Sequence, residues 1–145
     1  MQINKMDARI LTIRFESKIE MNTTMDKISN RYEGELKNRE GHNFPAEFVV
    51  KTDEIYKFVK DNNIKYIIAV YHFKSIQHEE LHAKYYLDAD YRKRIQKEWD
   101  EMDTKKREYI TKFLKRLGYS DKVIVDEYQA YRYSEKPNFF GISLY

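Results

Sequence analysis

The most informative stretch of the chain reads His78-Glu79-Glu80-Leu81-His82, in a sequence that contains only four histidines. On a helix, residues four positions apart lie on one face, so the two imidazoles can bind one metal ion together. Glu79 lies beside them and has the acid-base chemistry that a general base needs. The spacing therefore predicts a helical zinc site at which water is activated.

The composition limits the ligands of such a site to nitrogen and oxygen. The chain has no cysteine, which excludes disulfides, thiolate metal sites and cysteine nucleophiles. A catalytic zinc ion usually takes three protein ligands and leaves its fourth position to water. A third ligand must therefore come from outside the first motif. His42 and His72 have no comparable pattern around them and are interpreted as ordinary histidines.

A later segment reads Glu127-Tyr128-Gln129-Ala130 and lies in a predicted helix. Ala130 comes one turn after Glu127 on the same helical face, where a small side chain lets two helices approach closely. Together the two segments resemble the gluzincin group of zinc metallopeptidases, which carry H-E-x-x-H on one helix and a glutamate ligand, often in E-x-x-A, on a later one. The resemblance covers residues 76–131 and implies that His78, His82 and Glu127 bind Zn²⁺.

The same resemblance implies a reaction. Glu79 would take a proton from zinc-bound water, which attacks a peptide carbonyl, so the expected function is a zinc-dependent metallopeptidase with a peptide or protein substrate. Tyr131 and Tyr133 follow the ligand segment and are the candidates for stabilising the oxyanion. The acidic residue that commonly follows the alanine is Tyr131 here, so the carboxylate that orients a histidine ligand would have to be Asp126 or Glu80.

Apolar periodicity predicts the elements that position these residues. Before the motif we expect five elements: a half-buried strand over residues 8–15, a weakly helical segment over 24–36, a turn-rich loop over 40–45, a helix over 52–61 and a strand covered on both faces over 65–73. Ser75 is expected to cap the motif helix, which reaches about residue 87. A long amphipathic helix over residues 90–117, broken near Asp103, ends at Gly118, and a last helix begins at Ser120.

These elements predict an α+β fold in which a small N-terminal sheet packs on a helical C-terminal half that carries the zincin-like H-E-x-x-H helix. The 145 residues are the size of a single domain, with a C-terminal tail over residues 136–145. The tail is apolar enough to block a cleft, although packing on the core is the alternative we favour. No segment resembles a secretion signal or a membrane span, so we expect a cytoplasmic protein without a membrane partner.

Other functions remain open at this point. The net charge of +3 is spread along the chain, and the basic residues between Tyr91 and Arg107 could form a nucleic-acid-binding or protein-binding helix. Acidic residues interrupt that helix and would repel phosphate, so a solvated face with internal ion pairs is favoured. The zincin-like domain could also be a catalytically inactive scaffold. Finally, the motif could belong to a plain helix that packs Leu81 and Tyr85 inward and binds nothing.

Overall fold

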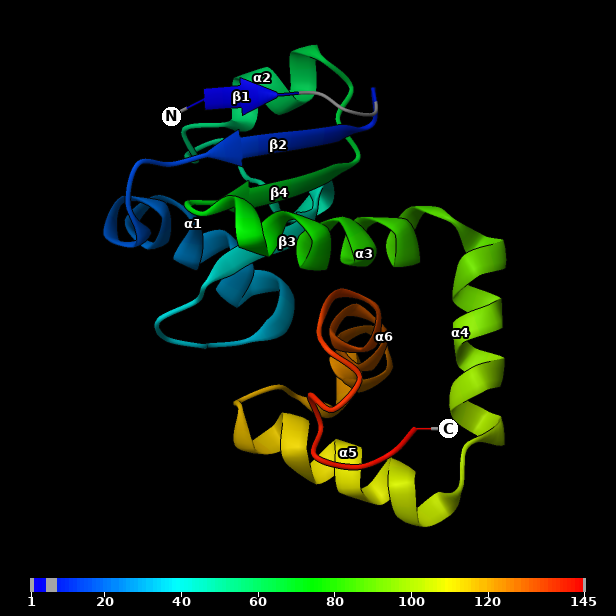
Figure 1. Ribbon diagram of the computed structural model, residues 1–145. Helices are drawn as coiled ribbons and strands as arrows, with labels where there is room; N and C mark the ends of the chain where they lie inside the picture. The colour runs from blue at the N-terminus through cyan, green and yellow to red at the C-terminus, as the bar shows by residue number, and fades with distance from the viewer. Residues whose placement is uncertain (1, 5–7, 145) are drawn as a thin grey trace.

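The computed structural model of the protein describes residues 2–4 and 8–144, and a four-stranded sheet occupies its N-terminal part (Figure 1). The strands are β1 (Gln2–Asn4), β2 (Ile10–Arg14), β3 (Gly41–Pro45) and β4 (Tyr66–Val70). Their order is β1-β2-β4-β3. The central pair β2 and β4 is parallel, whereas β1 and β3 run antiparallel to their neighbours at the two edges.

Among the described residues the structure also has six α-helices, and four of them follow the sheet in sequence. They are α1 (Lys18–Glu33), α2 (Tyr56–Asp61), α3 (Ile76–Leu87), α4 (Ala89–Glu101), α5 (Thr104–Arg116) and α6 (Ile124–Ser134). Short 3₁₀ turns lie at η1 (Ala46–Phe48), η2 (Phe73–Ser75) and η3 (Asp121–Val123). The α+β class with a helical C-terminal half is confirmed.

The two faces of the sheet are covered by different helices, because side chains alternate along a strand. On β4, Ile67 and Ala69 pack with α1 and α2, whereas Ile68 and Val70 pack with Ala83 of α3. All five residues of β4 are buried, as its unbroken apolar run predicts. Helix α3 thus lies directly on the sheet, which fixes its position.

The helical half surrounds α6. Helices α3, α4 and α5 run along three sides of a frame, and α6 lies inside it (Figure 1). Ile110 and Leu114 of α5 are fully buried against Ile124 and Tyr128 at the start of α6. Helix α6 consequently faces α3 on one side and an apolar cluster on the other.

Several predicted helix boundaries in this half are confirmed, whereas the last helix, expected from Ser120, begins with the 3₁₀ turn η3 and becomes α-helical at Ile124. The side chain of Asp88 accepts a hydrogen bond from the backbone N–H of Tyr91 at 3.0 Å and caps α4. The long helical segment is interrupted at Met102 and Asp103, between α4 and α5. Gly118 follows α5 with a φ of 106°, a left-handed conformation that favours glycine.

Other local predictions need correction. The helix expected over residues 52–61 begins only at Tyr56, as α2. Residues 40–45 contain β3 rather than a turn-rich loop: Gly, Asn and Pro are tolerated there because β3 is an edge strand, where Pro45 need not donate to a second neighbour. Helix α1 begins before residue 24, because Ser17 caps it by accepting from the N–H of Glu20 at 3.1 Å. Ser75 precedes α3 but makes no capping bond; its hydroxyl donates instead to the backbone oxygen of Glu40 at 3.2 Å.

The C-terminal tail packs on the helices, as the favoured alternative predicts. Phe140 is 1% exposed and belongs to the cluster of α5 and α6. The ring of Phe139 stacks on that of Tyr131 with centroids 4.6 Å apart. Up to residue 144, these contacts make the tail part of the apolar cluster that packs against α6.

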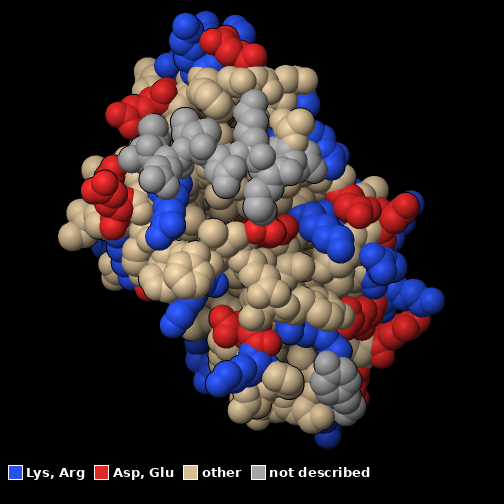
Figure 2. All heavy atoms as spheres, turned by 45° about the horizontal axis from the view of Figure 1, so that its top comes forward, with Lys and Arg blue, Asp and Glu red and all other residues tan. Residues whose placement is uncertain are grey.

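The face of the molecule in Figure 2 carries basic and acidic side chains that are interspersed, without a continuous basic track. Acidic residues therefore interrupt the positive potential that phosphate binding along this face would use. None of the helices in residues 2–4 and 8–144 has the length and apolar character that crossing a bilayer requires.

A buried histidine joins the edge strand to α1. His42 is 1% exposed, and its Nε2 lies 2.7 Å from Oδ1 of Asn22 while its Nδ1 lies 2.6 Å from the hydroxyl of Ser29. Because the amide oxygen only accepts, Nε2 carries the proton and Nδ1 accepts from Ser29. Burial, together with the positive charge of Arg39, lowers the pKa of His42 to about 3. The ring is therefore neutral in the folded protein at any ordinary pH.

This histidine should make the fold sensitive to acid. In the unfolded chain this histidine takes up a proton near pH 6.5. Its protonation therefore leaves the free energy of unfolding unchanged above that pH and lowers it increasingly as the pH falls toward 3. At pH 5 this effect lowers the free energy of unfolding by about 2 kcal/mol. We expect His42→Gln to be less stable at pH 7.5 but to lose less stability between pH 7.5 and 5, measured by urea unfolding. His72→Gln, at an exposed histidine, is the control; equal losses in all three proteins would refute the assignment.

Candidate metal centre

The position of α3 orients the two histidines of the motif. Ala83, with Ile76 and Leu87 beside it, packs against the sheet. His78 and His82 lie on the side that faces α6, one turn apart on the same helical face. The apolar face of the helix thus directs the imidazoles into the space between α3 and α6.

Three potential ligand atoms meet in that space. The Nε2 atoms of His78 and His82 are 3.1 Å apart. Nε2 of His82 lies 2.9 Å from Oε2 of Glu127, and Nε2 of His78 lies 3.5 Å from Oε1 of the same carboxylate. Within the described part of the chain, this trio is the group of histidines and acids that could hold a metal ion. The three ligand residues predicted from sequence are therefore brought together across 45 positions of chain.

The spacing of these atoms suits a small divalent cation. Two ligand atoms that each lie about 2.1 Å from a tetrahedral zinc ion are roughly 3.4 Å from one another. The observed separations of 2.9 to 3.5 Å fall around that value. Two imidazole nitrogens and one carboxylate oxygen are also a donor set typical of zinc and similar metals. The cluster can hold a metal ion with little rearrangement.

The far nitrogen of each imidazole lies close to an oxygen atom, as is typical of a metal-binding histidine, although the contact of His82 with Asp126 has the distance of an ion pair without the alignment of a hydrogen bond. Nδ1 of His82 lies 2.8 Å from Oδ1 of Asp126. Nδ1 of His78 lies 3.3 Å from the hydroxyl of Ser134, which itself donates to a backbone oxygen of α6. Of the two acids considered from sequence, Asp126 is therefore the one that orients a histidine; Glu80 lines a different groove of the surface.

Burial and the neighbouring charges together determine the protonation of the side chains in this space. Both Asp126 and Glu127 are buried beside His82. Burial opposes a charge on His82, but the two carboxylates outweigh that effect and raise its pKa well above the usual value. Burial likewise disfavours the Glu127 carboxylate, yet the adjacent histidines lower its pKa overall. The negative charge of the two carboxylates thus strongly favours a positive charge at the position of the ligand atoms.

The Glu79 side chain points toward the edge strand β3. Its Oε2 accepts a hydrogen bond from Nδ2 of Asn43 at 2.7 Å, and the hydroxyl of Tyr66 donates to Oδ1 of Asn43. A Cβ atom on Gly41 would come within 2.8 Å of Oε1 of Glu79, so glycine leaves room for the carboxylate. Burial is the main cause that raises the pKa of Glu79. A buried carboxylate with a raised pKa beside a metal site is suited to proton transfer.

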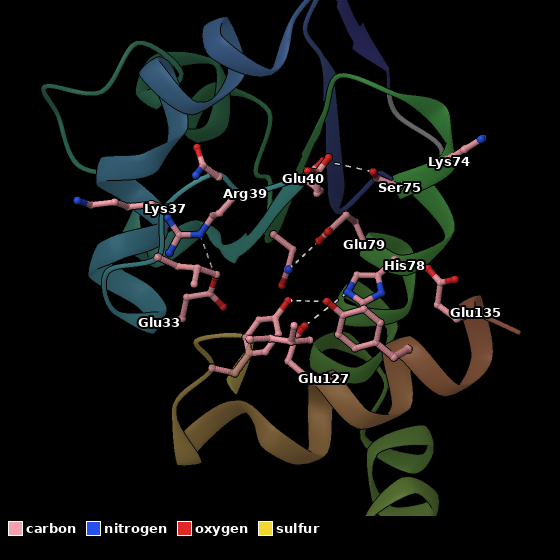
Figure 3. Close-up of a pocket in the computed structure, with 17 residues that line it drawn as sticks. Glu33, Lys37, Arg39, Glu40, Lys74, Ser75, His78, Glu79, Glu127 and Glu135 are labelled. Carbon is pink, nitrogen blue, oxygen red and sulfur yellow. Dashed lines mark hydrogen bonds and ion pairs between the residues drawn. The ribbon is translucent and has the colours of Figure 1, made fainter. Parts of the chain in front are cut away.

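A cavity of about 460 Å³ opens onto these groups. Figure 3 shows His78, Glu79 and Glu127 directed into it, with Glu33 and Arg39 on the opposite side. His82 is buried beneath the cavity floor and does not line it. The cluster therefore combines one sheltered candidate ligand, His82, with two that line the cavity.

The two tyrosines predicted to stabilise an oxyanion have different locations. Tyr131 lines the cavity, its ring packs on that of His78 with centroids 4.4 Å apart, and its hydroxyl lies 2.8 Å from that of Tyr119. The Tyr133 side chain is 45% exposed, and its hydroxyl donates to Glu98 of α4 at 2.9 Å. The structure brings Tyr131 to the site and directs Tyr133 away from it.

Several cavity residues were not predicted from the sequence, among them Asn43, Tyr119 and Arg39. Asn43 was hidden because its segment looked like a loop; on a strand, its alternation with the inward-facing His42 and Phe44 would have indicated the face toward α3. Tyr119 follows Gly118 in a connecting turn, and Arg39 lies in the loop before β3. No local pattern marks either residue, because only the tertiary fold brings these loops to the cavity.

No family model matches the chain, and neither the curated proteins nor the solved structures give a match. The resemblance to gluzincins accordingly rests on the residues of the site.

Asp126 provides a test of the arrangement around His82. Asp126→Asn keeps the size of the side chain but removes the negative charge beside Nδ1, so we expect zinc affinity to fall about 10- to 100-fold. Competition with a chromogenic chelator would measure the affinity. Asp121→Asn, at an exposed acid of η3, should leave it unchanged. Equal affinity in Asp126→Asn and the wild type would contradict the role of Asp126.

Proposed function

We propose that the protein is a zinc-dependent hydrolase of the metallopeptidase type, with His78, His82 and Glu127 as the metal ligands and Glu79 as the general base. The observation that carries this proposal is the convergence of two Nε2 atoms and one carboxylate within hydrogen-bonding distance at the floor of an open cavity. A structural helix pair would have little reason to bury two acids and two histidines together.

The residues around the ligands supply the remaining functions. A bound zinc ion lowers the pKa of water and polarises a carbonyl oxygen. Glu79 lines the same cavity and can take the proton from the attacking water, then deliver it to the leaving amine. Asn43 holds one oxygen of Glu79 and leaves the other for that transfer. Asp126 and Ser134 keep the two imidazoles oriented with Nε2 toward the centre.

A peptide substrate is favoured by the strand beside the cavity. In the described sheet β3 pairs with β4 on one side, so its other edge can offer backbone groups to an extended chain. Gly41 and Asn43 of this strand line the cavity next to Glu79. A peptide added along β3 would therefore pass close to both the general base and the ligands.

Zinc content and turnover test the proposal together. Purified protein without a histidine tag should contain one zinc ion per chain by elemental mass spectrometry, and His78→Ala, His82→Ala and Glu127→Ala should lose it. Glu79→Gln should retain zinc but lose at least about 100-fold in turnover of a peptide library, because it cannot accept a proton.

The matched control for these variants is Glu80→Gln, which alters the neighbouring acid on the far side of α3 and should keep both zinc and turnover. Absence of zinc in the wild type even after incubation with the metal would refute the site. Zinc without turnover of any peptide would leave a metal-binding scaffold and refute the enzymatic part.

The two tyrosines form a natural pair of test and control. Tyr131→Phe keeps the ring against His78 and Phe139 but removes the hydroxyl from the cavity. If that hydroxyl donates to the developing oxyanion, kcat should fall about 100-fold with little change in zinc content. Tyr133→Phe should leave kcat unchanged, since that hydroxyl contacts Glu98. An unchanged kcat in Tyr131→Phe would remove Tyr131 from the mechanism.

The nucleic-acid-binding alternative finds less support among the contacts of α4. The guanidinium of Arg92 donates to the backbone oxygens of Tyr85 and Tyr86 at 2.8 Å, and Lys97 pairs with Glu101 at 3.8 Å. These basic groups are already engaged within the molecule. Chelator-insensitive binding of RNA or DNA with a steep salt dependence would nevertheless favour that function over the hydrolase.

A further inference from the structure

Glu33 is a buried acid that the proposed chemistry does not use. It ends α1 and lines the cavity on the wall opposite His78 (Figure 3). Its side chain is 13% exposed, and its Oε1 lies 3.3 Å from Nε of Arg39. No second contact of the Glu33 carboxylate is recorded among residues 2–4 and 8–144. The second oxygen of this carboxyl group is therefore available to a ligand.

Arg39 has three other acceptors besides Glu33. Its guanidinium donates to Oδ1 of Asn30 at 2.8 Å, to the backbone oxygen of Gly34 at 2.9 Å and to Oδ1 of Asp26 at 3.3 Å. Those three contacts engage Nη1 and Nη2, and Asp26 partly neutralises the guanidinium, while Glu33 is the acceptor for Nε. Only Oε1 of Glu33 takes part in this pairing, so the contact with Arg39 leaves the second carboxylate oxygen for another partner.

The other basic residues at the cavity leave its interior acidic. Lys37 and Lys74 are exposed, and Figure 3 shows both side chains directed away from the centre. Glu79 and Glu127 occupy the opposite wall. Burial, followed by the negative charge of Glu127, raises the pKa of Glu33 to about 7, although the charge of Arg39 opposes this shift.

We propose that Glu33 binds a positively charged group of the substrate and makes the site selective for peptides that carry a cation close to the cleaved bond. This inference rests on the proposed function, because it concerns the substrate of the same cavity. The cation can be a free amino terminus or the side chain of lysine or arginine, because each donates charge-assisted hydrogen bonds to a carboxylate.

The surroundings of Glu33 suit such a group. Leu36 and Leu117 line the same cavity and offer apolar surface to the methylene groups of a long side chain. An ammonium group that enters between these residues can donate to the open oxygen of Glu33. Partial exclusion of water strengthens that interaction relative to one on the surface.

Four hexapeptide probes test the proposal, with lysine or norleucine at the central position and with a free or acetylated amino terminus. Zinc-loaded wild type should cleave at least one cationic probe about 10- to 100-fold more efficiently than the neutral acetylated norleucine probe, measured as kcat/KM by mass spectrometry. Glu33→Gln should abolish that ratio and leave the neutral probe unaffected. Whether lysine or the free terminus carries the preference identifies the source of the cation.

Glu35→Gln, at an exposed acid of the adjacent loop, is the matched control and should retain the ratio. Zinc content and thermal unfolding must be equal in the variants, which excludes a general structural effect. Binding of the same probes to zinc-loaded Glu79→Gln, with and without Glu33→Gln, by fluorescence anisotropy gives a readout independent of turnover. Cationic preference in binding without cleavage would support the role of Glu33 while refuting the hydrolase. Equal affinity for all probes, or none, would overturn the inference.

Discussion

Two adjacent carboxylates, Asp126 and Glu127, are buried in the same turn of α6, and much of the surrounding structure serves to make that burial possible. A buried negative charge is costly unless positive charge or several hydrogen-bond donors lie close to it. His82 contacts both residues, at 2.8 Å from Asp126 and 2.9 Å from Glu127. The protein can meet this demand with a proton on His82 or with a metal cation between the ligands. The same geometry therefore serves the folded apoprotein and the metal-binding site.

The orientation of Asp126 depends on residues outside the motif. Gln129 is fully buried; its amide nitrogen donates to Oδ1 of Asp126 at 2.9 Å and to the backbone oxygen of Leu81 at 3.1 Å. Its amide oxygen accepts from the hydroxyl of Tyr91 at 2.7 Å. These bonds connect α3, α4 and α6 around one carboxylate. The position of His82 is thus determined by three helices, although only two of them carry ligands.

Sequence patterns predicted the parts of the site that obey local rules. Helical spacing placed His78 and His82 on one face, and Glu127 with Ala130 matched a pattern in which a small residue lets helices approach. The role of Asp126 was open because neighbouring residues on a helix point about 100° apart, and only the crossing of α3 and α6 decides that both acids reach His82. The edge strand was missed since Gly41, Asn43 and Pro45 are typical of turns. Its identity follows from pairing with β4, a contact between segments about 25 residues apart.

The wall opposite the ligands comes from loops that meet across the cavity. Leu36, in the loop between α1 and β3, approaches Gly118 so closely that a Cβ there would lie 2.5 Å from Leu36 Cδ1. Tyr119 follows at once and joins its hydroxyl to that of Tyr131 on α6. Gly118 therefore has two constraints, a left-handed backbone that ends α5 and a close approach that closes the cavity. A cavity wall of this kind needs no additional layer of helices, because the connections required by the α+β fold already supply it.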